Sequence, residues 1–273
     1  MGKLEAVIAT IMTLKEAGEE ISDLFSTSIS SDFYSSLDKI TFLTNKSIGL
    51  GNNGGIIDST LKIGEATLGI GNLLVWGVLL FYVFCSLFQY FLSREVEIPW
   101  KVFIRSIIFG ILLNSAFFIC YYSIYIVENA TQYIIEVCGG ETSFSYIESL
   151  KADLDFETDE EIEEISIFSM DELLKIATYF MTFALGITLG VRFIFIKTMI
   201  LISPILLAFG CTKLTEKIFV KSIKLFFKLL SYQIIVVVIL EIFKNFNFTE
   251  DAILQIMLVS TMLLSIKIVK KIC

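Results

Sequence analysis

The chain has 273 residues, 55% of which are hydrophobic, and its mean hydropathy of +0.78 lies well above that of soluble domains. It contains no histidine, which excludes histidine-based catalytic triads, zinc-protease helices and histidine proton relays. The net charge is −8, but acidic and basic residues are concentrated in separate segments of the chain. Several long apolar runs therefore predict an all-α, polytopic helical membrane protein.

The first 70 residues are predicted to form an amphipathic region, at the membrane surface or outside the cytoplasm. Apolar residues recur at helical spacing in 2–25, which predicts a short surface helix. A run rich in asparagine and glycine at 50–55 indicates a turn before a second helical segment. In that second segment, Gly64 and Gly71 would let another helix approach closely, so we expect them at a helix–helix contact.

Residues 71–273 are predicted to form a helical transmembrane domain with about five crossings. The first two crossings are expected at 71–92 and 103–127. Asn114 lies in the middle of the second crossing, where its amide would seek a hydrogen-bonding partner on another helix. The segment 128–172 holds fourteen acidic residues and a single lysine, which predicts an acidic external loop.

The long apolar block that follows is interrupted by charges and by a proline. It exceeds the ~20 residues of one crossing, so we expect a third crossing at 173–191 that brings Arg192 and Lys197 to the cytoplasmic boundary. Pro204, preceded by Ser203, removes a backbone donor and predicts that the rest of the block continues as a bent or re-entrant half-helix. A complete sixth crossing by this remainder is the alternative.

The last two crossings are expected at 229–243 and 252–269. Charges inside a membrane are costly and often functional, so Arg192 and Lys197 have two interpretations. They either anchor the inner end of the third crossing or face a lumen, where Glu241 would be the acidic partner. In the five-crossing arrangement Glu241 lies near the outer face, which disfavours a direct pair with Arg192.

Five lysines directly after the apolar block form the sharpest pattern in the sequence. Their spacing confines them to a stripe of about 80° on a helix, which we name the lysine stripe: Lys213, Lys217, Lys221, Lys224 and Lys228. The predicted helix at 213–228 lies at the inner membrane surface. The stripe either reaches anionic lipid headgroups or docks an inner-side partner, such as a cytoplasmic ATPase or a polyanion such as DNA.

Basic residues also set the predicted orientation, because lysine and arginine accumulate in cytoplasmic segments near crossings. Arg94, Lys101 and Arg105 place the link between the first two crossings inside. The lysine stripe goes to the same side, and the acidic segment 128–172 goes outside. The N-terminus is therefore expected outside and the C-terminus in the cytoplasm.

The sequence offers no recognisable set of residues for catalysis or for a metal. The acidic run at 153–164 mimics the ligand order of a calcium loop, but Thr158 stands where that loop needs glycine. The absence of a phosphate-cradling Gly-Lys-Ser/Thr motif excludes nucleotide hydrolysis by this chain. The cysteines show no metal-ligand spacing. We therefore expect no enzymatic activity, no cofactor and no bound metal.

One segment resembles a known family. The run GVRFIFIKTMILISPILLAFG at 190–210 contains an arginine, an apolar stretch, then Ser-Pro and more apolar residues, and a basic stretch follows it. This run and the predicted layout of 71–270 resemble the TrbL/VirB-type polytopic inner-membrane subunits of conjugative type IV secretion systems. The first 70 residues do not share in the resemblance.

The resemblance implies a non-enzymatic part of a translocation channel or stalk base in the bacterial cytoplasmic membrane. It implies a homo-oligomer that contacts other secretion-system subunits and cytoplasmic ATPases, and contact with transferred DNA is a further implication. The alternative function is a small polytopic transporter or a pore-forming membrane protein. A transporter predicts inverted repeats and a polar site at the bilayer midplane, and the sequence shows no internal repeat.

Overall fold

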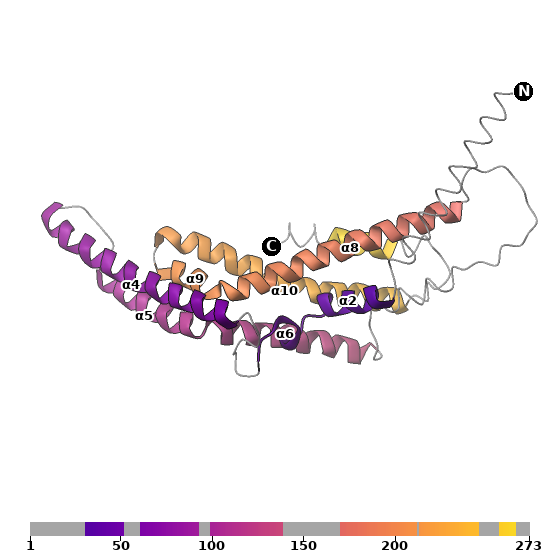
Figure 1. Cartoon of the computed structure of the whole chain (residues 1–273), viewed down its shortest axis with the longest axis horizontal. Coiled ribbons are helices and arrows are strands. Elements are labelled where there is room, and N and C mark those ends of the chain that lie inside the picture. The colour runs from indigo at the N-terminus through magenta and orange to yellow at the C-terminus, as the bar shows by residue number, and fades with distance from the viewer. Residues whose placement is uncertain are drawn as a thin grey trace, which may run out of the picture. The chain divides into compact units, whose positions relative to one another are not determined.

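The structure, a computed structural model, is helical wherever it describes regular secondary structure (Figure 1). The described residues are 31–51, 61–92, 99–138, 170–211, 213–245 and 257–265. The chain divides into two compact units, each assembled from separate stretches of sequence. Unit 1 comprises Met1–Phe42, Gln132–Val191 and Ile235–Ile272, and unit 2 comprises Leu43–Thr131 and Arg192–Ile234 together with Cys273. For the described residues, the predicted all-α class is confirmed.

Three of the described helices are long and apolar enough to cross a membrane. They contain the candidate spans Ile63–Phe84, Phe180–Leu201 and Thr215–Ile242. A bent pair of helices becomes a fourth candidate when it is counted as one broken span. Helix length and composition thus support a membrane-embedded protein, whereas the count of five crossings stays a prediction. Half of the expected last crossing, 252–256 and 266–269, lies outside the described residues, and 257–265 is helical.

The expected second crossing is divided between two helices, α5 (Pro99–Asn114) and α6 (Ala116–Val137), which meet at a bend of 62°. At the bend, the Ser115 amide is shared between the carbonyl oxygens of Ile111 and Leu112, at 3.2 and 3.1 Å. Asparagine and serine side chains compete for backbone groups inside helices, and the Asn114 amide does so here by donating to the Gly110 carbonyl at 2.8 Å. The uninterrupted helix expected over 103–127 is therefore corrected to a bent pair of helices, which is either a broken span or a re-entrant loop.

α6 also extends past the expected start of the acidic loop. Residues 128–137 are helical, so Glu128 and Glu136 lie on a helix and the predicted loop boundary at 128 is wrong. The sequence between Glu128 and Gly139 contains no glycine or proline to end the helix earlier. The part of the predicted loop at 139–169 lies outside the described residues.

The expected third crossing at 173–191 is too short. α8 (Met170–Leu201) continues past Arg192, which therefore lies within the candidate span Phe180–Leu201 and not at the end of a helix. Arginine is a good helix former, so the charge alone does not stop the helix. The break comes at Ile202, next to the proline, as the sequence predicts.

Beyond this break, the chain forms the short helix α9 (Ser203–Ala208) and the single 3₁₀ turn η1 (Phe209–Cys211). The segment is bent, but its re-entry into the membrane stays a prediction. α9 packs against both α4 (Leu61–Leu92) and α5, and these three helices lie together in Figure 1.

α10 (Lys213–Asn245) is one continuous helix of 33 residues. This finding corrects the expectation of a surface helix at 213–228 followed by a separate crossing at 229–243. The sequence from 213 to 245 contains no glycine or proline, so nothing divides it. At 1.5 Å per residue the helix is about 50 Å long, well beyond the ~30 Å of a hydrocarbon core.

Parts of the N-terminal region are buried, which the prediction of a surface region did not include. In unit 1, α2 (Ser31–Thr41) packs on α8, because a Cβ added at Gly186 would lie only 2.8 Å from the Phe33 ring. In unit 2, α3 (Asn45–Ile48) begins with a capping box formed by Thr44 and Ser47.

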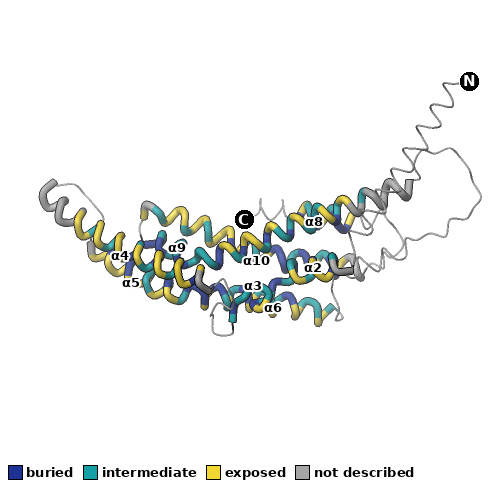
Figure 2. Tube along the Cα trace, viewed as in Figure 1, coloured by how far each residue is buried: buried dark blue, intermediate teal, exposed yellow. Residues whose placement is uncertain are grey.

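The core of unit 2 forms where the segment around α3 meets three longer helices. Leu43, Ile48 and Leu50 pack with buried side chains of α6, α8 and α10, which include Ile124, Ile196 and Leu230. Figure 2 shows buried residues as dark blue stretches that alternate with exposed ones along these helices. The expected amphipathic helix at 2–25 lies outside the described residues.

Candidate functional site

The candidate site is the stretch of unit 2 that runs from Arg192 through the proline break into the first half of α10. At the break, Pro204 has no N–H to offer the carbonyl of Ile200, one turn earlier. The Ser203 hydroxyl takes over this role and donates to the Ile200 carbonyl at 2.7 Å. The Ser-Pro pair therefore ends α8 while leaving that carbonyl hydrogen-bonded.

Two glycines allow the helices around the break to pack closely. A Cβ added at Gly71 on α4 would lie 2.9 Å from Leu113 of α5 and 3.0 Å from the carbonyl oxygen of Pro204. A Cβ added at Gly210 would overlap the ring of Phe109. We call this contact of α4, α5 and α9 the proline junction, and its buried core consists of Val75, Leu113, Ala208 and Cys211.

Cys211 is fully buried in the proline junction, between the candidate spans of α8 and α10. Burial raises the pKa of its thiol to about 11, and the positive charge of Arg105 opposes this rise only in part. The thiolate is the reactive form of cysteine. Cys211 is therefore an unreactive structural side chain at neutral pH.

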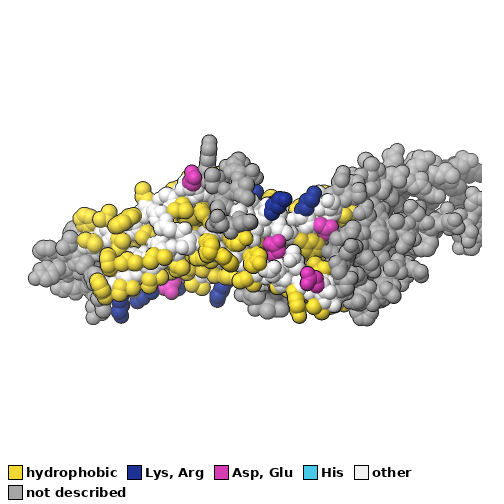
Figure 3. Space-filling view, turned by 90° about the horizontal axis from the view of Figure 1, so that it is seen from below, with side chains coloured by type: hydrophobic (Ala, Val, Ile, Leu, Met, Phe, Trp, Pro, Cys, Tyr) yellow, Lys and Arg dark blue, Asp and Glu magenta, His cyan; other side chains and the backbone are white. Residues whose placement is uncertain are grey.

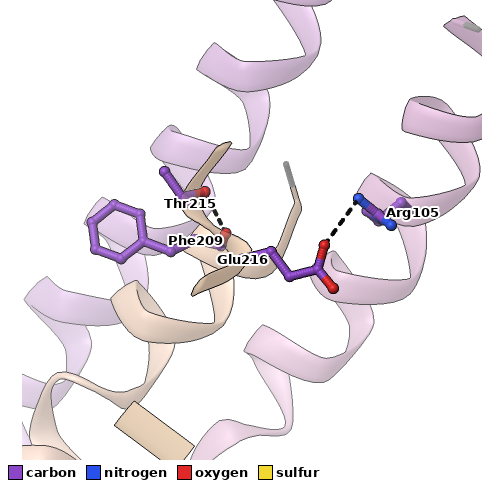
Figure 4. Close-up of polar contacts among 4 residues, drawn as sticks. All are labelled: Arg105, Phe209, Thr215 and Glu216. Carbon is purple, nitrogen blue, oxygen red and sulfur yellow. Dashed lines mark hydrogen bonds and ion pairs between the residues drawn. The ribbon is translucent and has the colours of Figure 1, made fainter. Parts of the chain in front are cut away.

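The start of α10 is tied to α5 and to η1, as Figure 4 shows. A guanidinium nitrogen of Arg105 lies 3.9 Å from a carboxylate oxygen of Glu216, and both side chains are partly exposed. The Thr215 hydroxyl donates to the carbonyl of Phe209. Such an exposed ion pair contributes about 1 kcal/mol at most, but it places the basic end of α5 beside the lysine-bearing end of α10.

Arg192 is directed into the protein. Its side chain is only 6% exposed, its Nε donates to the carbonyl oxygen of Leu229 at 2.8 Å, and its guanidinium lies 5.2 Å from the centre of the Tyr232 ring. Buried charges in membrane proteins generally face the interior and engage backbone carbonyls. Arg192 therefore clamps α8 to α10, while its place relative to the membrane boundary stays a prediction. Lys197 is half-buried one turn further on.

A second polar contact lies beside this clamp and was missed from the sequence. Buried Gln233 accepts a hydrogen bond from the Leu43 amide at 3.1 Å and donates to the Thr131 hydroxyl at 3.3 Å. It thereby joins α10 to α6 and to the chain before α3. An amide inside an apolar run was the available signal, because a polar group there needs a partner.

Glu241 belongs to unit 1, where it is 3% exposed. Arg192 belongs to unit 2. The described contacts of Arg192 include the Leu229 carbonyl oxygen and the Tyr232 ring.

The lysine stripe is largely exposed. Lys213, Lys217, Lys221 and Lys224 are exposed and Lys228 is half-buried. The opposite side of the helix packs inward through Phe226, which is buried, and through Phe219, whose ring meets the Phe109 ring edge-on at 5.2 Å. At 100° per residue, these two phenylalanines lie about 180° from the centre of the stripe. The stripe is therefore the outermost line of α10.

The predicted packing residues fall in two places. Asn114 forms a reciprocal amide pair with Asn72 of α4, with both distances at 3.4 Å. Gly71 lies in the proline junction. Gly64, about two turns earlier on α4, is buried, and its carbonyl oxygen accepts a hydrogen bond from the Thr67 hydroxyl at 2.9 Å. Among the described residues, no group of three or more acidic or cysteine side chains is placed to hold a metal ion.

Comparison of this chain with protein-family models, curated proteins and solved structures finds no match.

Proposed function

We propose that this chain is a non-enzymatic, integral-membrane subunit of a conjugative type IV secretion apparatus, where it forms part of the channel or stalk base. The observation that carries the proposal is the architecture of the run that resembles this family. Its arginine is a buried clamp, its Ser-Pro pair is a capped helix break, and its final glycine fits against an aromatic ring. A lysine-rich helix follows directly.

The exposed surface of α4 supports assembly with other membrane subunits. This helix contains the least buried of the candidate spans, and Leu73 and Trp76 on it are 72% and 67% exposed. Figure 3 shows hydrophobic side chains across much of the face in view. The proposed neighbours are further copies of this chain, other secretion-system subunits and cytoplasmic ATPases, in a bacterial cytoplasmic membrane with the N-terminus outside.

In the test, the gene is deleted from a donor cell that carries a conjugative DNA element, and the recipient cells that acquire this element are counted. Transfer should fall to background while growth is unchanged, and a wild-type copy should restore it. As a matched pair of variants, Gly190→Ala should restore transfer because a Cβ there meets no described atom within 4 Å, whereas Gly210→Ala should fail because it disrupts the proline junction. Immunoblotting of membranes checks that both variants insert. Normal transfer by the deletion strain would refute the proposal.

The alternative, a small transporter or a pore, is separated by a second measurement. The buried charges Arg192 and Glu241 are the residues that favour it, because such charges often mark ion or substrate pathways. Purified protein in liposomes would then carry ions or small solutes without any other subunit. If Arg192→Met abolishes this flux and the deletion strain still transfers DNA normally, the protein is a transporter or pore and not a secretion subunit.

A further inference from the structure

The first half of α10 presents apolar side chains on both sides of its lysines. Ile218 and Leu225 are 50% and 44% exposed on one side, and Val220 and Phe227 are 39% and 51% exposed on the other. At 100° per residue, each pair lies within about 60° of an edge of the lysine stripe. The helix therefore has a buried face, two exposed apolar flanks and a basic crest between them.

We propose that the lysine stripe binds the anionic phosphate headgroups of the bilayer that holds this protein. Lysine side chains lay their methylene stems along apolar surface and extend their ammonium groups to the phosphate level. The exposed flanks supply the apolar contact that acyl chains need. A soluble acidic protein or a nucleic acid would leave the same flanks in water, so the flanks favour lipid over these partners.

The length of α10 places the stripe at the correct depth. About 20 helical residues cross the hydrocarbon core, so the last 20 residues of this helix, from 226 onward, are sufficient for a crossing. The first thirteen residues then extend into the headgroup region, and they carry Lys213, Lys217, Lys221 and Lys224. A helix of this length also fits within the bilayer and its headgroups by tilting.

The start of α5 reaches the same headgroup level as the lysine stripe. The contact of Arg105 with Glu216 places the start of α5 beside the start of α10. One turn before Arg105, Lys101 is exposed, and Trp100 next to it is 65% exposed. Tryptophan combined with basic residues is typical of the membrane–water interface. Two helices that are distant in the sequence therefore present an interfacial pattern at one end of unit 2.

The test uses quenching of tryptophan fluorescence by brominated lipids in vesicles of phosphatidylglycerol and phosphatidylcholine. The reporter is Leu225→Trp, which lies within one turn of Lys221 and Lys224, in a background with Trp76→Phe and Trp100→Phe. The reporter should be quenched preferentially by brominated phosphatidylglycerol. A lysine near an anionic surface contributes about fivefold to association, so Lys221→Gln with Lys224→Gln should lower this preference at least fivefold, whereas the double arginine variant should keep it.

Two controls separate the stripe from general charge effects. Lys39→Gln with Lys46→Gln removes the same charge from exposed lysines on α2 and α3 and should leave the preference unchanged. Trp76 alone, on the exposed face of α4, should show equal quenching by both lipids. No preference at the reporter, or an equal loss in the control pair, would overturn the proposal. Displacement of the lipid by a DNA oligonucleotide at physiological salt would assign the stripe to a polyanion instead. This binding does not rest on the secretion function.

Discussion

Within unit 2, positive charge is accommodated in different ways in the interior around Arg192 and Pro204 and on the exposed first half of α10. In the interior, the positive charge of Arg192 is held by a carbonyl oxygen and an aromatic ring. The carbonyl oxygen of Pro204 lies so close to Gly71 that a side chain there would crowd against it. In the first half of α10, by contrast, Lys217, Lys221 and Lys224 are exposed. The effect of a substitution in the interior should therefore depend on shape and on specific contacts. The effect of a lysine substitution should depend on the total charge of the lysine stripe.

The largest contrast is expected in thiol reactivity. Cys211 should react with a maleimide roughly 200-fold more slowly at pH 8 than a cysteine introduced by Lys221→Cys, since a pKa of about 11 leaves little thiolate compared with an ordinary value near 8.5. Because the pKa is raised, labelling of Cys211 should increase as the pH rises toward 11. Mass spectrometry of the labelled peptides measures both rates. Rapid labelling of Cys211 at pH 8 would show that the proline junction opens.

The same substitution should have unequal effects in the two regions. Arg192→Met loses a charge-assisted hydrogen bond worth about 1.5–3 kcal/mol and a cation–π contact, while the desolvation of the guanidinium offsets part of the loss. We expect the free energy of unfolding to fall by about 2 kcal/mol. Lys224→Met should change it by less than about 0.5 kcal/mol. Unfolding in mixed micelles provides the measurement, and equal effects would contradict the clamp.

The smallest effect is expected from a pair of glycines on α4. Gly71→Ala forces a Cβ against the Pro204 carbonyl oxygen, which costs about 1–3 kcal/mol, and the better helix propensity of alanine returns about 1 kcal/mol. The net loss should be about 1 kcal/mol. Gly77→Ala meets no described atom within 4 Å and should stabilise the protein slightly. Similar thermal stabilities for the two variants would show that α4 and α9 are not in close contact.

The elements of this fold that follow from hydrophobic length and from proline were predictable. The helical membrane class, the break at Ser203-Pro204 and the outward lysine stripe each depend on local sequence, because apolar run length, a missing N–H and helical periodicity act within a few turns. The ends of helices were less predictable. Arg192 was expected to end α8, but its partners on α10 stabilise it inside the helix, and these partners lie 37 and 40 residues away in the sequence.

Contacts between distant segments could not be derived from spacing alone. Nothing near Gln233 indicates that it accepts from the Leu43 amide, 190 residues earlier in the chain. The amide of Asn114 predicted a partner on another helix but not which one, and Asn72 is one of several polar residues within the expected crossings. At the bend between α5 and α6 the Ser115 amide is shared, and α5 packs on α4, which is distant in sequence from the bend.

The bend at Ser115 has a consequence for the order of events at the ribosome. α5 contains 16 residues and is about 24 Å long, shorter than the hydrocarbon core. When it leaves the insertion machinery it cannot span the bilayer as an independent helix. We expect it to insert together with α4, on which it packs and whose 32 residues are made first. Insertion of α5 should therefore depend on α4 being present in the membrane.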